Sequence, residues 1–147
     1  MSKRLGLLAM IVLVICTSSA MVSALEQQKT ISGDGGYIIQ PSHQTTMRPL
    51  TVYNTITQGM TNWESKSVTT TITTLNVDLY WGNPSNSLQL TIYSPDGHVF
   101  GPYYDNSDGY HDGAINLVIS NTGGIAKGTW YYKVYGYSVT GTQSYSI

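Results

Sequence analysis

Short runs of apolar residues alternate with polar ones along most of the chain, and this pattern predicts β-strands. The clearest runs lie at 75–81, 88–93, 115–119 and 130–135, where every second side chain is aliphatic or aromatic. A period of two places each apolar set on one face of a sheet. We therefore expect a core built from thirteen residues: Leu75, Val77, Leu79, Trp81, Leu88, Leu90, Ile92, Ile115, Leu117, Ile119, Trp130, Tyr132 and Val134.

Turn-forming residues separate these runs. Gly, Asn, Pro and Asp cluster between them, as in the Pro-Asp-Gly turn at 95–97. Similar runs predict strands at 51–57, 63–68, 99–104 and 143–147. About eight short strands at this spacing predict an all-β fold, an antiparallel β-sandwich with jelly-roll character.

The first 24 residues have the pattern of a secretory signal peptide. Lys3 and Arg4 precede an apolar run, and Val22-Ser23-Ala24 supplies the small residues of a cleavage site. The alternative is an N-terminal membrane anchor, and we expect contact with a membrane only if this segment is retained. The expected organisation is a signal peptide at 1–24, a linker or N-terminal strand region at 25–49 and one β-sandwich domain at 50–147.

Composition supports a secreted domain without disulfides or strong charge. Only 10% of the 147 residues are charged and the formal net charge is −1, which removes the electrostatic footprint expected for nucleic-acid binding. The single cysteine, Cys16, lies within the predicted signal peptide, so a mature chain would have no disulfide. Its stability would depend on the core alone.

The segment from 56 to 147 resembles the bacterial and archaeal pre-peptidase C-terminal domain. The residues that carry the resemblance are Ile-Thr-Gln-Gly at 56–59 followed by Trp63, Leu-Asn-Val-Asp-Leu at 75–79, the run at 88–97 ending in Pro-Asp-Gly, and Gly-Thr-Trp within 128–136. The resemblance implies a β-sandwich, secretion and no catalysis. Such domains usually follow a secreted protease, and 147 residues leave no room for one, so we expect a free-standing module. The Thr-, Asn- and Tyr-rich composition also resembles small secreted proteins of methanogenic archaea.

An acidic cluster at 105–113 is the sharpest chemical feature. Its oxygen-bearing residues are Asp105, Asn106, Asp108 and Asp112, and two Asp-Gly steps allow tight turns. Calcium takes six to eight oxygen ligands, so these four could contribute to a Ca²⁺ site, although the spacing is not that of an EF-hand. The alternative is a turn in which the aspartates bond their own backbone.

Tyrosines form the second feature. Tyr80, Tyr93, Tyr131, Tyr135 and Tyr137 fall on the faces opposite the expected core. If their strands are neighbours, they form one aromatic binding surface. The alternative is that tyrosine simply suits half-exposed strands. We interpret Trp63, Trp81 and Trp130 as core residues, although the phase of Trp63 within its run is unclear.

The motifs of common enzyme classes are missing from the sequence. We therefore expect a secreted, non-catalytic binding or adhesion module at or outside the cell surface. The expected partner is an envelope polymer, a carbohydrate or a secreted protein. One alternative is a structural, self-assembling protein of the cell envelope, and a more remote one is a small secreted hydrolase.

Overall fold

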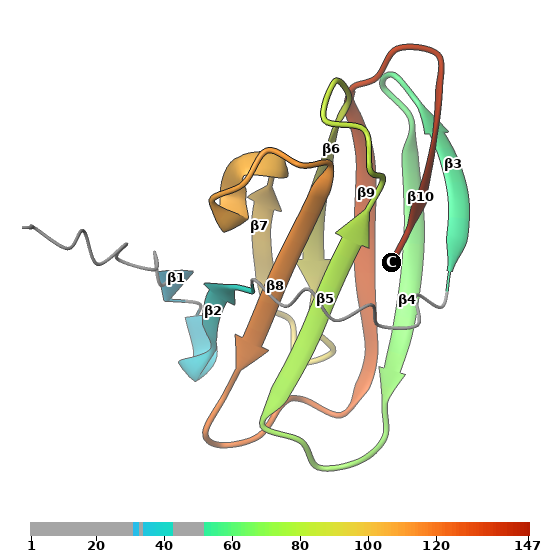
Figure 1. Ribbon diagram of the computed structural model, residues 1–147. Coiled ribbons are helices and arrows are strands. Elements are labelled where there is room, and N and C mark those ends of the chain that lie inside the picture. Colours follow the sequence, from blue (N-terminus) through green and yellow to red (C-terminus); the bar gives the residue numbers. More distant parts are fainter. Residues whose placement is uncertain (1–30, 33, 43–51) are drawn as a thin grey trace, which may run out of the picture.

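Two antiparallel β-sheets pack face to face in the computed structural model, which describes residues 31–32, 34–42 and 52–147 (Figure 1). The larger sheet has six strands in the order β1-β2-β8-β5-β10-β3, and the smaller has four in the order β4-β9-β6-β7. The predicted all-β sandwich is confirmed. The predicted signal peptide and much of the region at 25–49 lie outside the described residues.

The six-stranded sheet contains β1 (Ile31–Ser32), β2 (Ile38–Pro41), β3 (Tyr53–Thr57), β5 (Thr74–Tyr80), β8 (Ala114–Ser120) and β10 (Thr142–Ser146). The four-stranded sheet contains β4 (Thr61–Val68), β6 (Ser87–Tyr93), β7 (Val99–Tyr103) and β9 (Gly128–Ser138). Two short 3₁₀ turns complete the elements, η1 (Asp34–Gly36) and η2 (Asp105–Asp108). Within the described ranges, no helix is long and apolar enough to span a bilayer.

The chain crosses repeatedly from one sheet to the other. The connections β3 to β4, β4 to β5, β5 to β6, β7 to β8, β8 to β9 and β9 to β10 all join different sheets, whereas β6 and β7 form a hairpin within one sheet. Apart from the β1–β2 and β6–β7 pairs, strands therefore pair with partners distant in sequence, as β5 does with β8. The two sheets can form only together, because the strands of each are interleaved along the chain.

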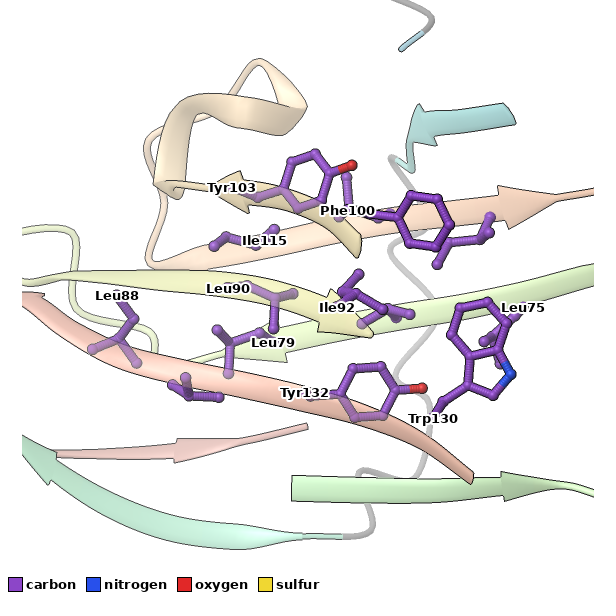
Figure 2. Packing of buried hydrophobic residues seen from close by; sticks show 14 of the residues in the cluster. Leu75, Leu79, Leu88, Leu90, Ile92, Phe100, Tyr103, Ile115, Trp130 and Tyr132 are labelled. Carbon is purple, nitrogen blue, oxygen red and sulfur yellow. The ribbon is translucent and has the colours of Figure 1, made fainter. Parts of the chain in front are cut away.

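The inward faces of the two sheets form a single core. All thirteen residues predicted from the period-two pattern are buried, each with at most 5% of its surface exposed. Figure 2 shows Leu79 and Ile115 from the larger sheet and Leu90 and Tyr132 from the smaller one within the same layer. Burying each such aliphatic side chain contributes about 1.5–3 kcal/mol, which is the main source of stability in a domain without disulfides.

The N-terminal segment adds one aromatic side chain, that of Tyr37, to this core. Tyr37, immediately before β2, is 1% exposed and packs edge-on against Trp130 and Phe100, with ring centroids 5.9 and 5.2 Å away. Its hydroxyl donates to Asp96 Oδ2 at 2.7 Å, in the turn between β6 and β7. Burial, followed by this hydrogen bond, raises the pKa of Tyr37 to about 12. The segment before residue 50 is thus partly integral to the sandwich.

One glycine is required where the β3–β4 turn meets β9. The Gly136 amide donates to Met60 O at 3.0 Å, and the Gly59 amide donates to Gly136 O at 2.9 Å. A Cβ atom on Gly136 would lie only 2.2 Å from Thr57 O. The absence of a side chain at Gly136 therefore lets the turn close against the smaller sheet.

Candidate functional site

The outward side of the four-stranded sheet presents a concentration of aromatic rings, which we call the aromatic face. On β9, buried Trp130, Tyr132 and Val134 alternate with outward residues that are half-buried or exposed. The same alternation on β6 and β4 turns further rings outward. The aromatic residues of this face are Trp63, Tyr93, Tyr104, Tyr131, Tyr135 and Tyr137.

Strand register brings three of these rings together at one end of the face. Tyr93 of β6 lies directly opposite Tyr131 of β9, and Trp63 of β4 lies opposite Lys133 of β9. The Trp63 and Tyr93 rings meet above β9, with centroids 5.2 Å apart and planes tilted by 46°. Trp63 and Tyr131 remain 56% and 49% exposed, so about half of each of these two residues is open to solvent.

A second pair of rings lies at the other end of the face. Tyr104, just after β7, packs edge-on against Tyr137 with centroids 4.9 Å apart. The Gln89 side-chain amide donates to the Tyr104 hydroxyl at 2.7 Å and holds that ring in place. Gln58 in turn donates to Tyr137 O at 3.0 Å, which fixes the end of β9. Tyr137 is therefore set on a strand of the sheet, and Tyr104, although it follows the end of β7, is tied to the sheet through Gln89.

The structure divides the predicted tyrosine surface. Tyr93, Tyr131, Tyr135 and Tyr137 share the aromatic face, but Tyr80 lies on β5 in the other sheet and cannot join them. The interpretation of Trp63 as a core residue is wrong, because its side chain is 56% exposed. Its strand β4 is at the edge of its sheet, where neighbouring polar residues blur the inward–outward pattern.

The acidic cluster folds into η2 and the turn that follows it. Asp105 is 2% exposed, and its Oδ1 accepts the amides of Gly113 and Ala114 at 3.0 and 3.2 Å. Its other oxygen contacts Nδ1 of His111, whose imidazole is largely exposed. This carboxylate therefore positions both the start of β8 and the imidazole.

Asp108, at the end of η2, anchors the loop in a similar way. It is also 2% exposed, and its two oxygens accept the amides of Tyr110 at 3.1 Å and Asn116 at 2.9 Å. Burial raises the pKa of Asp108, and the nearby charges of Asp112 and Asp105 also raise it. The hydrogen bonds from the Asn116 and Tyr110 amides lower the pKa but do not cancel the effect of burial. The hydrogen bonds to these amides partly offset the free-energy cost of burying the charge, and the bond to Asn116 holds the loop against β8.

These contacts are those of the turn alternative considered from the sequence. Asp105 and Asp108 direct their oxygens at backbone amides, whereas Asn106 and Asp112 are exposed. In the described ranges of the chain, no three His, Cys, Asp or Glu residues are grouped so that they could hold a metal ion. Calcium binding by the four residues Asp105, Asn106, Asp108 and Asp112 stays a prediction.

A pocket of about 370 Å³ joins this loop to the end of the aromatic face. Its lining residues are Ser87, Tyr104, Asp105, Asn106, His111 and Tyr137. The pocket thus combines the second ring pair with an amide, a hydroxyl and an imidazole. Sequence reasoning missed it, because Ser87 and Tyr137 come from strands far in sequence from the acidic loop.

Comparison with known proteins adds little about function. No family model matches the chain. An uncharacterized protein of Archaeoglobus fulgidus is 53% identical over 47 residues, which is 32% of this chain. The matched segment spans 65% of that relative's length. The pre-peptidase C-terminal resemblance therefore stays a prediction.

Proposed function

We propose that this protein is a secreted, non-catalytic β-sandwich module that binds an envelope polymer through its aromatic face. The observation that carries the proposal is the set of rings on one side of the four-stranded sheet, with Trp63 and Tyr131 each about half exposed. Exposed aromatic surface held on a rigid sheet is costly to leave in water, and such patches are typical of binding surfaces.

The arrangement of the rings supports binding over a purely structural role for tyrosine. Cross-strand tyrosine pairing alone would explain Tyr93 opposite Tyr131. It does not explain an exposed tryptophan on the edge strand β4 whose ring reaches across β9 to Tyr93. A polar residue at position 63 would be hydrated at this edge of the sheet at a lower free-energy cost than tryptophan.

The hydrolase alternative receives less support. Asp105 and His111 are in contact, and Ser87 lines the same pocket. Among the described residues, however, no hydrogen bond joins the Ser87 hydroxyl to the imidazole, so the proton path that a serine nucleophile needs is not assembled. The self-assembly alternative predicts concentration-dependent association of the pure protein, which sedimentation measures directly.

The proposal is tested by measuring how much of the protein is retained on insoluble cell-envelope material. The protein is used in the form in which it is purified from its host. We expect the double variant Trp63→Ala/Tyr131→Ala to lose retention. The matched control is Tyr80→Ala, which removes an equally exposed ring from the opposite sheet and should leave retention unchanged. Equal retention of all three proteins, or equal loss in both variants, would contradict a role for the aromatic face.

The secretion component of the proposal has its own test. The resemblance and the N-terminal pattern both favour release after Ala24, so mass spectrometry of extracellular protein should give an N-terminus near Leu25. Recovery of the full-length chain in the membrane fraction would instead support the N-terminal anchor.

A further inference from the structure

The aromatic face differs from the rest of the molecule in charge. The chain has eight acidic and seven basic residues. Along the fully described strands β4, β6 and β9, the outward positions carry no carboxylate, and their single charge is Lys133. The remaining outward residues besides the rings are Ser, Thr and Gln, whose hydroxyl and amide groups donate and accept hydrogen bonds.

Lys133 lies at the centre of this face. Its neighbours across the strands are Trp63 on β4 and Thr91 on β6, and the Trp63 and Tyr93 rings meet above its strand. The side chain is half-buried, which is the usual arrangement of a lysine that covers its apolar stem and keeps the ammonium in water. Within the described residues, no hydrogen bond or ion pair engages this ammonium.

The face is also long enough for an extended ligand. From Tyr131 in the first ring cluster to Tyr137 in the second, β9 rises about 20 Å at the usual rise of about 3.3 Å per residue. Thr91 and Gln89 line the neighbouring strand over this distance. A ligand that runs along the strands would meet rings at both ends and hydrogen-bonding groups with one cation between them.

We propose that the ligand of the aromatic face is an acidic glycan, a polysaccharide in which some of the sugar rings carry a carboxylate; this inference rests on the proposed function. The apolar faces of sugar rings can pack on aromatic rings, and the intervening Thr and Gln groups match sugar hydroxyls. The Lys133 ammonium forms a charge-assisted hydrogen bond with a sugar carboxylate. The lack of carboxylates on this face spares an anionic chain the repulsion it would meet elsewhere on the molecule.

Single-stranded nucleic acid also stacks on aromatic rings, but the charge of this face disfavours it. Proteins that bind it follow the backbone with a positively charged groove, because every nucleotide carries a phosphate. A face with one lysine can neutralise one anionic group. An acidic glycan in which uncharged sugars separate the carboxylates, as in hyaluronate, satisfies that condition, because one carboxylate can lie at Lys133 while uncharged sugars lie on the aromatic rings.

The test compares matched polymers. Binding of the intact protein is measured to polygalacturonate, alginate and hyaluronate, each beside its carboxyl-reduced form. We expect at least one acidic polymer to bind about two- to fivefold more tightly than its reduced form, the range of an exposed ion pair. Lys133→Gln should abolish this difference and its sensitivity to salt. Trp63→Ala should weaken binding to both forms.

The outcomes separate this inference from the proposed function. Equal binding of acidic and reduced polymers, or a difference that survives Lys133→Gln, would overturn the acidic-glycan inference. Tighter binding of single-stranded DNA than of any polysaccharide would overturn the ligand class. If no polymer binds while envelope retention still depends on Trp63 and Tyr131, the inference fails and the proposed function stands. If envelope retention is independent of both residues, the proposed function fails as well.

Discussion

Trp130 and Trp63 provide a direct test of how the sandwich divides its two faces. Trp130 is fully buried, with its ring stacked on Phe100 and its indole N–H donating to Ala126 O at 2.9 Å. Trp63 belongs to the same sheet but is 56% exposed. Replacing each by alanine removes the same atoms from opposite sides of one layer.

The expected loss for Trp130→Ala follows from these contacts. A buried aromatic side chain covers about 150–250 Å², which at about 25 cal/mol per Å² corresponds to roughly 4–6 kcal/mol. Partial collapse of the cavity reduces the measured cost of such substitutions to about 3–5 kcal/mol. Since domains hold only about 5–15 kcal/mol in total, the Trp130 variant should be close to unfolding. Trp63→Ala should cost less than about 1 kcal/mol, as expected for surface positions.

Urea denaturation followed by far-ultraviolet circular dichroism measures both values, because all three proteins report the same loss of β-structure. Trp130→Phe is a useful intermediate, since it keeps an aromatic ring beside Phe100 and removes the hydrogen bond to Ala126 O. Equal stability of the Trp130→Ala variant and the parent would refute the packing argument. A loss for Trp63→Ala as large as that for Trp130→Ala would show that Trp63 belongs to the core after all.

Three further predictions concern the turns and loops. Gly136→Ala should destabilise the protein by several kcal/mol in thermal unfolding, because the new Cβ would lie 2.2 Å from Thr57 O; an unchanged melting temperature would contradict that contact. Because burial raises the pKa of Asp108 in the folded state, its ionised form costs stability at neutral pH. The free energy of unfolding of the parent relative to Asp108→Asn should therefore increase as the pH falls from 7 through that raised pKa toward about 4, where the unfolded carboxyl also protonates; a flat difference would show that the shift is absent. If the acidic loop binds calcium, melting curves in millimolar calcium should show a gain near 2.7 kcal/mol over those in chelator, as expected at about one hundred times the dissociation constant; coinciding curves would leave the turn alternative, in which Asp105 and Asp108 accept backbone amides.

Much of this fold could be predicted because its strands bury one face cleanly. The central strands β5, β6 and β9 alternate between buried and outward residues, as does β8 from Ile115 onward, so the sequence identifies their core residues without knowledge of the pairing. The Pro-Asp-Gly turn at 95–97 likewise marks the hairpin between β6 and β7. Where burial follows the period of two, that period is enough to identify the core residues.

The candidate site depends on pairing, which a local pattern does not encode. Tyr80 and Tyr93 have equivalent outward phases in their strands, yet they lie on different sheets. Trp63 lies on an edge strand whose pattern of burial is irregular, so its exposure followed only from the position of β4 in the sheet. Sequence period gives the face of a side chain, whereas topology decides which side chains share that face.

The acidic loop shows a second reason why the sequence alone does not predict the candidate site. Clustered aspartates are compatible both with a cation site and with a turn that satisfies its own amides, and only the folded structure identifies the partners. Asp105 reaches Gly113 and Ala114, and Asp108 reaches Asn116, each eight or nine residues further along the chain. Such contacts span a turn whose shape the local sequence does not specify.

The binding role of the aromatic face is the central claim, and Trp63 is a natural reporter of it. Trp81 and Trp130 are 5% and 0% exposed, so acrylamide in solution should quench chiefly the fluorescence of Trp63. Adding soluble envelope polymer should protect this signal from quenching in the parent, and the protected component should be missing in Trp63→Phe. Quenching that stays unchanged at concentrations where the polymer is shown to bind would place the ligand elsewhere on the molecule and contradict the account.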